Sequence, residues 1–452
     1  MKKTFLCSLL MAAAIPGVAC AQDIFEALSD AYRGNPTLQA QRAYLRSIDE
    51  NVAIAKSGYR PNIYLQGSYA DADVDSNQPG DAGRTKQKVI AAKVSQPLFS
   101  GLRTVNSVKS ADKIVRSQQD NLFNVEQTVF LDASTAYLDV LRDTAIVDLQ
   151  KNNEKLLKKR LDETIQRFNV GEVTRTDVSQ ARARHSQAKA DRISSEGTLQ
   201  ASRANYARII GVRPEDLKSP ESLDKFLPAS FEEALEYAKV HNYSILQAKN
   251  YLEAKEYDVK TQTGALLPSI TLDGEASKTR GDIDILPNDS EVDNLEWSVN
   301  MTVPLYSSGE TRAKIRQSKY QKWQAREQVA EAERSVTESV TSAWEYMLAN
   351  KAMLSSIKDQ IKANEIALDG VQKEEALGNR TILDVLDAYQ ELLNSNVEQV
   401  KARRNYYVSA MSLLQAMGKL TARNLNLDVE YYDAKKFYKE TRDKWLSISV
   451  DG

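Results

Sequence analysis

Two aspartates are the residues in this sequence whose spacing most strongly suggests chemistry. Asp384 and Asp387 are three residues apart in a stretch rich in helix formers, so their carboxylates share one helix face. In a single chain, the simple interpretation is a helix cap or a partner of the helix dipole. If several copies surround one axis, the same carboxylates form stacked rings that select and bind cations.

No grouping of residues in the 452-residue chain indicates catalysis. The two histidines, His185 and His241, are far apart and have no ligand-like company, so surface positions are the simple interpretation. The sequence holds no Gly-rich phosphate loop, no Ser/His/Asp grouping and no cluster with metal-ligand spacing. With 60 basic and 62 acidic residues, the nearly balanced charge gives no nucleic-acid footprint. We therefore expect no enzyme, no cofactor, no metal and no nucleic-acid partner.

The N-terminal segment 1–21 has the form of a secretory signal peptide. A basic start is followed by a short apolar run and by Ala19, Cys20 and Ala21, which fit the small-residue cleavage pattern. Lipidation of Cys20 as the first mature residue is the alternative. The other cysteine, Cys7, also lies in this segment, so disulfides are excluded from the mature chain. No later run of about 18 apolar residues exists, so a helical membrane span is not expected.

An internal duplication organises the rest of the chain. Eight landmarks recur at an offset of 207 residues: Ala27, Asn35, Pro61, Pro97, Ala136, Gly171, Asp177 and Gly211 recur as Ala234, Asn242, Pro268, Pro304, Ala343, Gly378, Asp384 and Gly418. This offset is far above the period of about 20–50 residues in solenoid repeats, so each unit is a module of several elements. We expect a first structural repeat at 22–228, a second at 229–427 and a C-terminal tail at 428–452.

The placement of proline predicts long helices in each repeat. Proline is absent from Leu98 to Arg213 and from Leu305 to the end, and both stretches are rich in good helix formers. The expected helices, interrupted at the two landmark glycines, are 104–169, 176–209, 311–376 and 383–416. The first would be on the order of 100 Å long. Its apolar residues step by threes and fours, which is typical of a narrow coiled-coil-like stripe, and they are Val108, Ala111, Val115, Leu122, Val125, Val129, Ala133, Ala136 and Val140.

Three segments between the helices alternate apolar and polar residues with period two, and a fourth, Lys88–Gln96, does so less cleanly. Leu295, Trp297 and Val299, for example, alternate with polar neighbours. We expect strands at about 61–70, 88–97, 268–278 and 294–304, joined in pairs by turn-rich polar linkers at 71–87 and 279–293. This length and alternation are typical of membrane-spanning β-strands. Two soluble hairpins with one face on a core are the alternative.

Four membrane strands cannot close a barrel by themselves. Lipid tolerates no unpaired strand edge, and about eight strands are the minimum for a membrane barrel. Several chains must therefore share one barrel, and three chains would supply twelve strands. The expected fold is mainly α with a membrane β-barrel, and each chain contributes a duplicated strand pair plus a long helical hairpin.

Two segments carry a family resemblance. They are Arg167-Phe168-Asn169-Val170-Gly171 with Thr176-Asp177-Val178, and Gly378-Asn379-Arg380-Thr381-Ile382-Leu383-Asp384-Val385-Leu386-Asp387-Ala388. Through them, and over nearly the whole mature chain, the sequence resembles the TolC-type outer membrane efflux family. The resemblance implies a homotrimer whose twelve-stranded barrel lies in outer membrane lipid and continues as an α-helical tunnel across the periplasm. A periplasmic adaptor and an inner membrane transporter would dock at the helical end.

The resemblance also implies a function. Such proteins passively conduct substrates outward in drug efflux and type I protein secretion, without catalysis. A periplasmic coiled-coil adaptor of an export system is the alternative, but it would need one hairpin and small β-domains. A secreted enzyme is a second alternative, opposed by the lack of a catalytic cluster. The tail at 428–452 either wraps around the middle of the helical barrel, as the family implies, or is disordered.

The resemblance assigns roles to residues at the helical end. Asp384 and Asp387 match positions that line the narrowest part of the tunnel, and crowding in a trimer should raise some of their pKa values. Arg380 matches an arginine that bonds to the first hairpin, where Thr176 and Asp177 stand here. Glu375 stands where the family has a tyrosine in the closed gate, and a carboxylate there can accept a bond from a neighbouring arginine.

The turns of the two hairpins are the expected adaptor contacts. Gly171 and Glu172 stand at the first turn, and Gly378 and Asn379 stand at the second. Each glycine also has the simpler role of permitting the turn, and the two roles are compatible.

Overall fold

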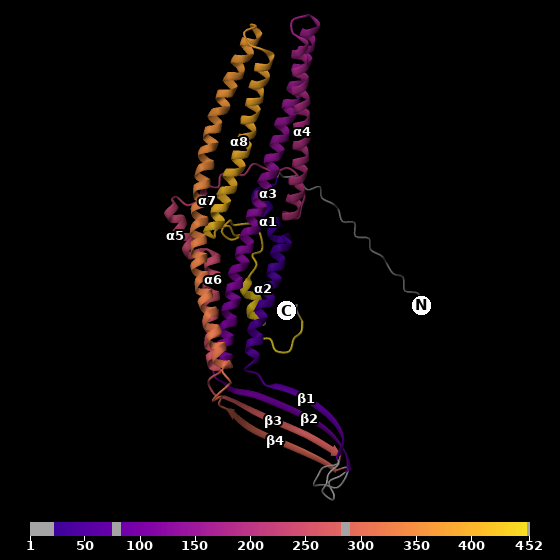
Figure 1. The fold of residues 1–452 in the computed structure, drawn as a ribbon, viewed down its shortest axis with the longest axis vertical. Coiled ribbons are helices and arrows are strands. Elements are labelled where there is room, and N and C mark those ends of the chain that lie inside the picture. Colours follow the sequence, from indigo (N-terminus) through magenta and orange to yellow (C-terminus); the bar gives the residue numbers. More distant parts are fainter. Residues whose placement is uncertain (1–21, 75–82, 282–289, 450–452) are drawn as a thin grey trace, which may run out of the picture.

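The structure is a computed structural model that describes residues 22–74, 83–281 and 290–449. The expected signal peptide at 1–21 and the lipidation alternative at Cys20 lie outside the described residues. Figure 1 shows an elongated molecule, with a sheet at one end and two long helical hairpins that extend away from it. Among the described residues, no helix combines the length and the apolar character that a membrane span requires.

Within the described residues, each repeat contains four helices and two strands. The first comprises α1 (Ile24–Gly34), α2 (Pro36–Ser57), β1 (Asn62–Val74), β2 (Gly83–Ser100), α3 (Arg103–Asn169) and α4 (Arg175–Ile210). The second comprises α5 (Phe231–His241), α6 (Tyr243–Gly264), β3 (Ser269–Gly281), β4 (Ser290–Thr302), α7 (Glu310–Ala376) and α8 (Ile382–Met417). Every element of the second repeat begins 207 residues after its counterpart. A short 3₁₀ turn (Asp224–Phe226) joins the repeats, and α9 (Ala434–Thr441) follows them.

The four long helices lie within one residue of the expected bounds at each end. The apolar stripe predicted for α3 is buried, except that Val108 and Val125 are half-buried. The shorter helices were not predicted individually, although Asn35 followed by Pro36 is a typical helix start. Asn35 caps α2 by accepting hydrogen bonds from two backbone N–H groups, and Asn242 caps α6 by accepting one from the backbone N–H of Ser244.

The strands form one antiparallel sheet in the order β1-β2-β3-β4. The prediction of polar linkers at 71–87 and 279–293 is wrong over much of their length. Strands β1 and β2 continue into the first segment, and β3 and β4 continue into the second. Backbone pairing does not require apolar side chains, and cross-strand ion pairs such as Lys278–Glu291 support the polar ends. Within the described residues, β1 and β4 remain the outer strands of this sheet.

The main hydrophobic core lies at the middle of the molecule, where the short helices pack against the long ones. Tyr137, Tyr206 and Phe130 are its largest fully buried side chains. The hydroxyl of Tyr206 donates to the side-chain oxygen of Gln22 at 2.7 Å, so its polar atom is satisfied inside the core. This core holds the bases of both hairpins, while the hairpin ends project away from it (Figure 1).

The C-terminal tail is ordered along α2 as far as the described chain extends. The backbone N–H of Tyr432 donates to the hydroxyl of Tyr32 at 2.9 Å. The guanidinium of Arg46 lies 5.3 Å from the ring centroid of Phe437 in α9. The hydroxyl of Tyr438 contacts Asp112 of α3 at 2.5 Å. The tail therefore covers α2 of the first repeat.

Candidate functional site at the hairpin ends

Each helical hairpin turns at a glycine in the left-handed region. Gly171 has φ 83° and Gly378 has φ 78°. The N–H of Glu172 donates to the carbonyl of Arg167, and the N–H of Asn379 donates to that of Glu374, both at 2.9 Å. Because no atom lies within 4 Å of a Cβ built at either glycine, the backbone conformation rather than space requires glycine here.

A capping box starts the returning helix of each hairpin. The carboxylate of Asp384 accepts hydrogen bonds from the backbone N–H and the hydroxyl of Thr381, both at 2.8 Å. Asp177 makes the same contacts with Thr174 in the first hairpin. The helix-cap interpretation of Asp384 therefore describes the single chain.

The pKa of Asp384 is lowered from its ordinary value, first by the backbone N–H of Thr381 and then by the hydroxyl of the same residue. The sequence analysis expected a raised pKa from carboxylates crowded together in a trimer. Those neighbouring carboxylates belong to other chains, so a single chain shows only the lowering by its own cap. Within one chain, Asp384 is a charged carboxylate whose geometry is fixed by its cap.

Asp387 lies one turn further along α8 and contacts the other hairpin. An NH2 nitrogen of Arg184, on α4, donates to its carboxylate at 2.5 Å. Both side chains are exposed, at 38% for Arg184 and 54% for Asp387. Asp387 is therefore paired across the gap between hairpins, whereas Asp384 is paired within its own hairpin.

The expected bond from Arg380 to the first hairpin is not present in the described chain. Its Nε donates to Glu374 of the same hairpin at 3.0 Å, and it bonds to neither Thr176 nor Asp177. The short loop between α7 and α8 places both ends of this pair at one tip, so the local partner is closer. This contact stabilises the tip without joining the hairpins.

Other residues make the contacts between the hairpins. Glu375 accepts a hydrogen bond at 2.6 Å from Arg167 of α3, and this carboxylate is only 16% exposed. The hydroxyl of Tyr389 accepts at 3.0 Å from Arg160, also on α3. Together with Arg184–Asp387, these contacts connect α3 to α7, α4 to α8 and α3 to α8.

Sequence reasoning missed Arg160, Arg184 and Tyr389 as contact residues, and it quoted Arg167 only as part of a motif. Comparing the charges at equivalent positions of the two repeats would have indicated that the hairpins attract each other. Glu374 stands at the position of Arg167, and Glu391 stands at that of Arg184. Two duplicated hairpins with opposite charges at matched positions are complementary surfaces.

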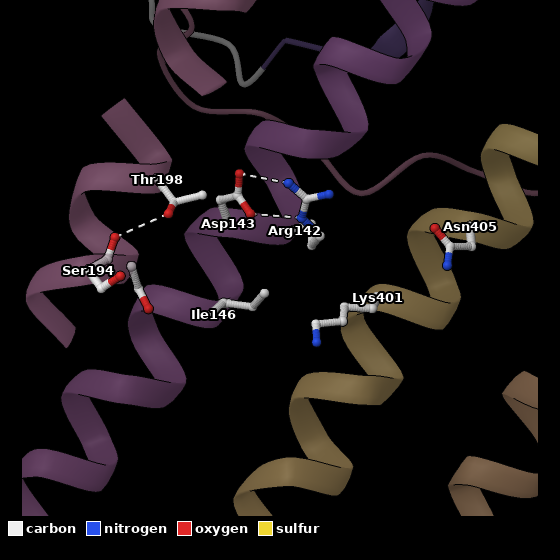
Figure 2. A pocket seen from close by; sticks show the side chains of 8 residues that line it. Arg142, Asp143, Ile146, Ser194, Thr198, Lys401 and Asn405 are labelled. Atoms are coloured by element: carbon white, nitrogen blue, oxygen red, sulfur yellow. Dashed lines mark hydrogen bonds and ion pairs between the residues drawn. The ribbon is translucent and has the colours of Figure 1, made fainter. Parts of the chain in front are cut away.

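A crevice between the hairpins lies nearer the core and measures about 380 Å³. Figure 2 shows that Arg142 points at Asp143, while Lys401 and Asn405 face them from α8. Arg142 donates to Asp143 at 2.7 and 2.9 Å and to Asp139 at 2.8 Å. Arg404 of α8 also donates to Asp139 at 2.8 Å. These charges are paired with one another, so the crevice is a structural junction between α3 and α8.

No group of three or more His, Cys, Asp or Glu side chains in the described part of the chain has an arrangement that could hold a metal ion. The hairpin ends therefore offer paired charges, exposed carboxylates and tight turns as their chemistry. A sheet with two open edges, continued by very long helical hairpins, is the protomer architecture of an outer membrane channel with a helical tunnel.

Comparison with known proteins identifies the family. The model of the family described as Outer membrane efflux protein matches residues 27–212 and 234–419, so the chain belongs to that family. It is 35% identical to Outer membrane efflux protein BepC of Brucella suis biovar 1 (strain 1330), over 95% of this chain and 92% of that protein. It is 26% identical to Outer membrane protein TolC of Escherichia coli (strain K12), over 90% and 84%.

A solved structure supports the same fold. The outer membrane channel CmeC of Campylobacter jejuni matches with a TM-score of 0.80 at 15% identity, over 93% of this chain and 89% of that chain. The expected fold class of membrane barrel plus helical tunnel is confirmed. The protein is an outer membrane channel of the efflux and type I secretion class, extending into the periplasm, and the adaptor alternative is set aside.

Proposed function

We propose that the protein is a homotrimeric conduit that passes substrates from an inner membrane transporter and a periplasmic adaptor to the exterior without catalysis. The order of the sheet carries this proposal. Because β1 and β4 are the outer strands, each copy offers two edges that lipid cannot satisfy. Pairing β1 of one copy with β4 of the next would close twelve strands from three chains.

The hairpin turns are the proposed adaptor contacts. Gly171 and Glu172 in one turn, and Gly378 and Asn379 in the other, lie at the end furthest from the sheet (Figure 1). Each glycine follows an exposed apolar residue, Val170 at 73% and Leu377 at 77% exposure in the two turns. An apolar side chain presented on a rigid turn suits a protein partner better than it suits water.

The proposed constriction is formed by Asp384 and Asp387 in the three copies. The capping box holds Asp384 in one geometry, and the pair with Arg184 holds Asp387 toward the first hairpin. Opening the hairpins would break that pair and leave the Asp387 carboxylate free. The constriction would then bind cations more strongly as it opens.

The proposed latch consists of contacts between the two hairpins of one copy, above all Arg167–Glu375 and Arg184–Asp387. Arg380 supports the second tip through Glu374. Thr176 and Asp177 remain proposed gate contacts, because the assembled trimer brings neighbouring hairpins to the first tip.

The assembly is tested by extracting outer membranes in detergent and comparing gel mobility before and after heating. A shared barrel should run as a trimer that heat converts to monomer. A monodisperse monomer recovered from the soluble periplasmic fraction would contradict both the trimer and the shared barrel.

The constriction is tested by single-channel recording of Asp384→Ala combined with Asp387→Ala in planar bilayers. Block by a trivalent cation added from the periplasmic side should be abolished, and cation selectivity should fall, with the trimer intact. Asp162→Ala, an exposed carboxylate on α3 that pairs with Lys158, is the matched control and should retain the block. Unchanged block in the double variant would reduce both aspartates to helix caps.

A further inference from the structure

The described part of the C-terminal tail, which extends to residue 449, includes a loop held at the base of α2. Lys56, in the last turn of α2, forms an ion pair with Asp443 at 2.5 Å. Arg60 donates to the backbone carbonyl of Lys444 at 3.1 Å, and its guanidinium lies 5.1 Å from the ring centroid of Trp445. Figure 1 shows the end of the described chain turning beside the lower end of α2. Three contacts therefore fix this loop in one place.

The loop presents apolar side chains to the surroundings rather than to the core. Trp445 is 63% exposed and Leu446 is 89% exposed. Arg60 contacts one face of Trp445, and most of the surface of both side chains is left open. A fixed loop that exposes a tryptophan and a leucine side by side has a surface suited to an apolar partner.

The position of this loop coincides with the start of the membrane strands. Arg60 lies two residues before Asn62, where β1 begins. The apolar face of β1 starts at Ile63, which is 71% exposed, and continues at Leu65, which is 75% exposed. Since the lipid-facing side chains of a membrane strand alternate with the others, this apolar face begins at the periplasmic boundary of the bilayer.

We propose that Trp445 and Leu446 insert into the periplasmic leaflet of the outer membrane and anchor the tail to phospholipid. Tryptophan is enriched at the level of lipid headgroups because its ring is apolar and its N–H is polar. Arg60 and Lys444 stand beside it, and basic side chains there attract anionic headgroups. The tail then links the lipid surface to α2, continuing the lipid-facing surface that the strands begin.

The test uses full-length protein in vesicles of phosphatidylethanolamine and phosphatidylglycerol that carry bromine on their acyl chains. The chain has four tryptophans, at 297, 323, 344 and 445, and variants that replace three of them with phenylalanine leave one emitter each. Bromine placed near the headgroups should roughly halve the fluorescence of Trp445, and bromine placed deep in the bilayer should quench it less.

Two of the other tryptophans are internal controls. Trp297 of β4 is 63% exposed and should be quenched by deep bromine as part of the barrel surface. Trp323 of α7 is 60% exposed, which matches Trp445, but it lies thirteen residues beyond Glu310, about 20 Å along the helix from the sheet. Its fluorescence should be unchanged.

Quenching of Trp445 no greater than that of Trp323 would overturn the proposal. A blue-shifted but unquenched Trp445 would show that a neighbouring subunit, not lipid, covers the loop, and would overturn it as well. If the triple replacement fails to assemble, Trp445→Phe in the otherwise unchanged chain gives the complementary measurement. It should lose the quenching component that shallow bromine produces, and retention of that component would contradict the anchor.

Discussion

The two repeats have the same order of helices and strands, but one equivalent acidic position is exposed in the second repeat and buried in the first. In the second repeat, Glu256 of α6 pairs with Lys322 of α7 at 2.8 Å, and both side chains are more than 40% exposed. The counterpart of Glu256 is Asp49 of α2, which is 1% exposed and has no hydrogen-bond partner for either carboxylate oxygen. The counterpart of Lys322 is Val115, which is also 1% exposed.

The tail explains this difference. It runs along α2 in the first repeat, where Tyr438 of α9 packs against the cluster of Val52, Ala111 and Val115. A covered position favours an apolar residue over a lysine, so Val115 stands where the second repeat has Lys322, and it offers Asp49 no ion pair. Burial, followed by the nearby charge of Glu50, raises the pKa of Asp49 to about 7. The two repeats therefore share their backbone geometry, while solvent exposure determines whether an equivalent acid is ion-paired or has a raised pKa.

The largest effect should come from Asp49→Asn. The folded pKa lies above the ordinary value of 3.8, so the folded state binds more protons than the unfolded state between pH 4 and about 7. The stability of the wild type should therefore fall as pH rises through that window, by on the order of 2 to 4 kcal/mol. The variant should lose the contribution of Asp49 to this dependence, while the raised pKa values of Glu126 and Asp120 keep theirs. It should melt at a higher temperature than the wild type at pH 8.

Circular dichroism melts at pH 5 and pH 8 measure this effect, and Glu256→Gln is the matched control. Because Glu256 and Lys322 form an exposed pair, breaking it should cost less than about 1 kcal/mol. The control should therefore lower the melting temperature slightly at pH 8. Equal behaviour of the two variants would show that the tail does not seal Asp49 from water.

The next prediction concerns a hydrogen bond that both repeats contain. The Nδ2 of Asn35 donates to the carbonyl of Ile209, and that of Asn242 donates to Ala416, both at 2.8 Å. Replacing either asparagine with alanine removes a helix cap and leaves a carbonyl unpaired, at a cost of about 2 to 3 kcal/mol.

The two alanine variants should show matching losses in denaturant titrations. Thr37→Ala, an exposed side chain in the first turn of α2, is the control and should change little. A loss confined to one repeat would mean that the framework is not equivalent in the two halves, despite its matching bond lengths.

The sequence predicted the features that depend on neighbouring residues and missed those that depend on contacts between distant ones. The long helices were predicted closely because proline, glycine and helix-forming residues act locally, and the repeat offset supplied a second reading of each boundary. A helix cap at Asp384 was one of the interpretations that the sequence offered, since an acidic residue near a helix start is a short-range pattern. For Glu375 the sequence indicated an arginine donor but did not identify Arg167, and the pair of Arg184 with Asp387 was not predicted, because both pairs join residues more than 200 positions apart.

The tail was the least predictable region. Its docking on α2 depends on rings that stack on arginines of another helix, such as Phe437 on Arg46, and no local period in the sequence encodes that match. Asp49 lies on the same helix, one turn before Val52, against which Tyr438 of the tail packs. The repeat offset shows that Asp49 and Glu256 occupy equivalent positions, but only the fold shows which of the two acids is buried.

The smallest effect in free energy concerns the hairpin ends, where the repeats differ in charge. The first hairpin supplies Arg167 and Arg184, and the second supplies Glu375 and Asp387 as their partners. An exposed ion pair contributes about 0.2 to 1 kcal/mol, and the half-buried Arg167–Glu375 pair should lie near the upper end of that range, so removing both pairs should shift the opening equilibrium by about 30-fold. Such a shift changes stability little but changes conductance visibly, because a closed channel passes almost no current.

Arg167→Ala combined with Arg184→Ala should therefore raise the resting conductance in planar bilayers while the trimer stays resistant to detergent. Each single variant should give a smaller rise, because the two contacts connect different helices of the hairpins and act in parallel. Arg182→Ala removes an equal charge two residues from Arg184, on an exposed face of α4, and should leave the conductance unchanged. If the double variant conducts like the wild type, opposite charge on the two hairpins does not hold the channel closed. The closing contacts would then have to lie between neighbouring copies, where Thr176, Asp177 and Arg380 remain the residues to replace.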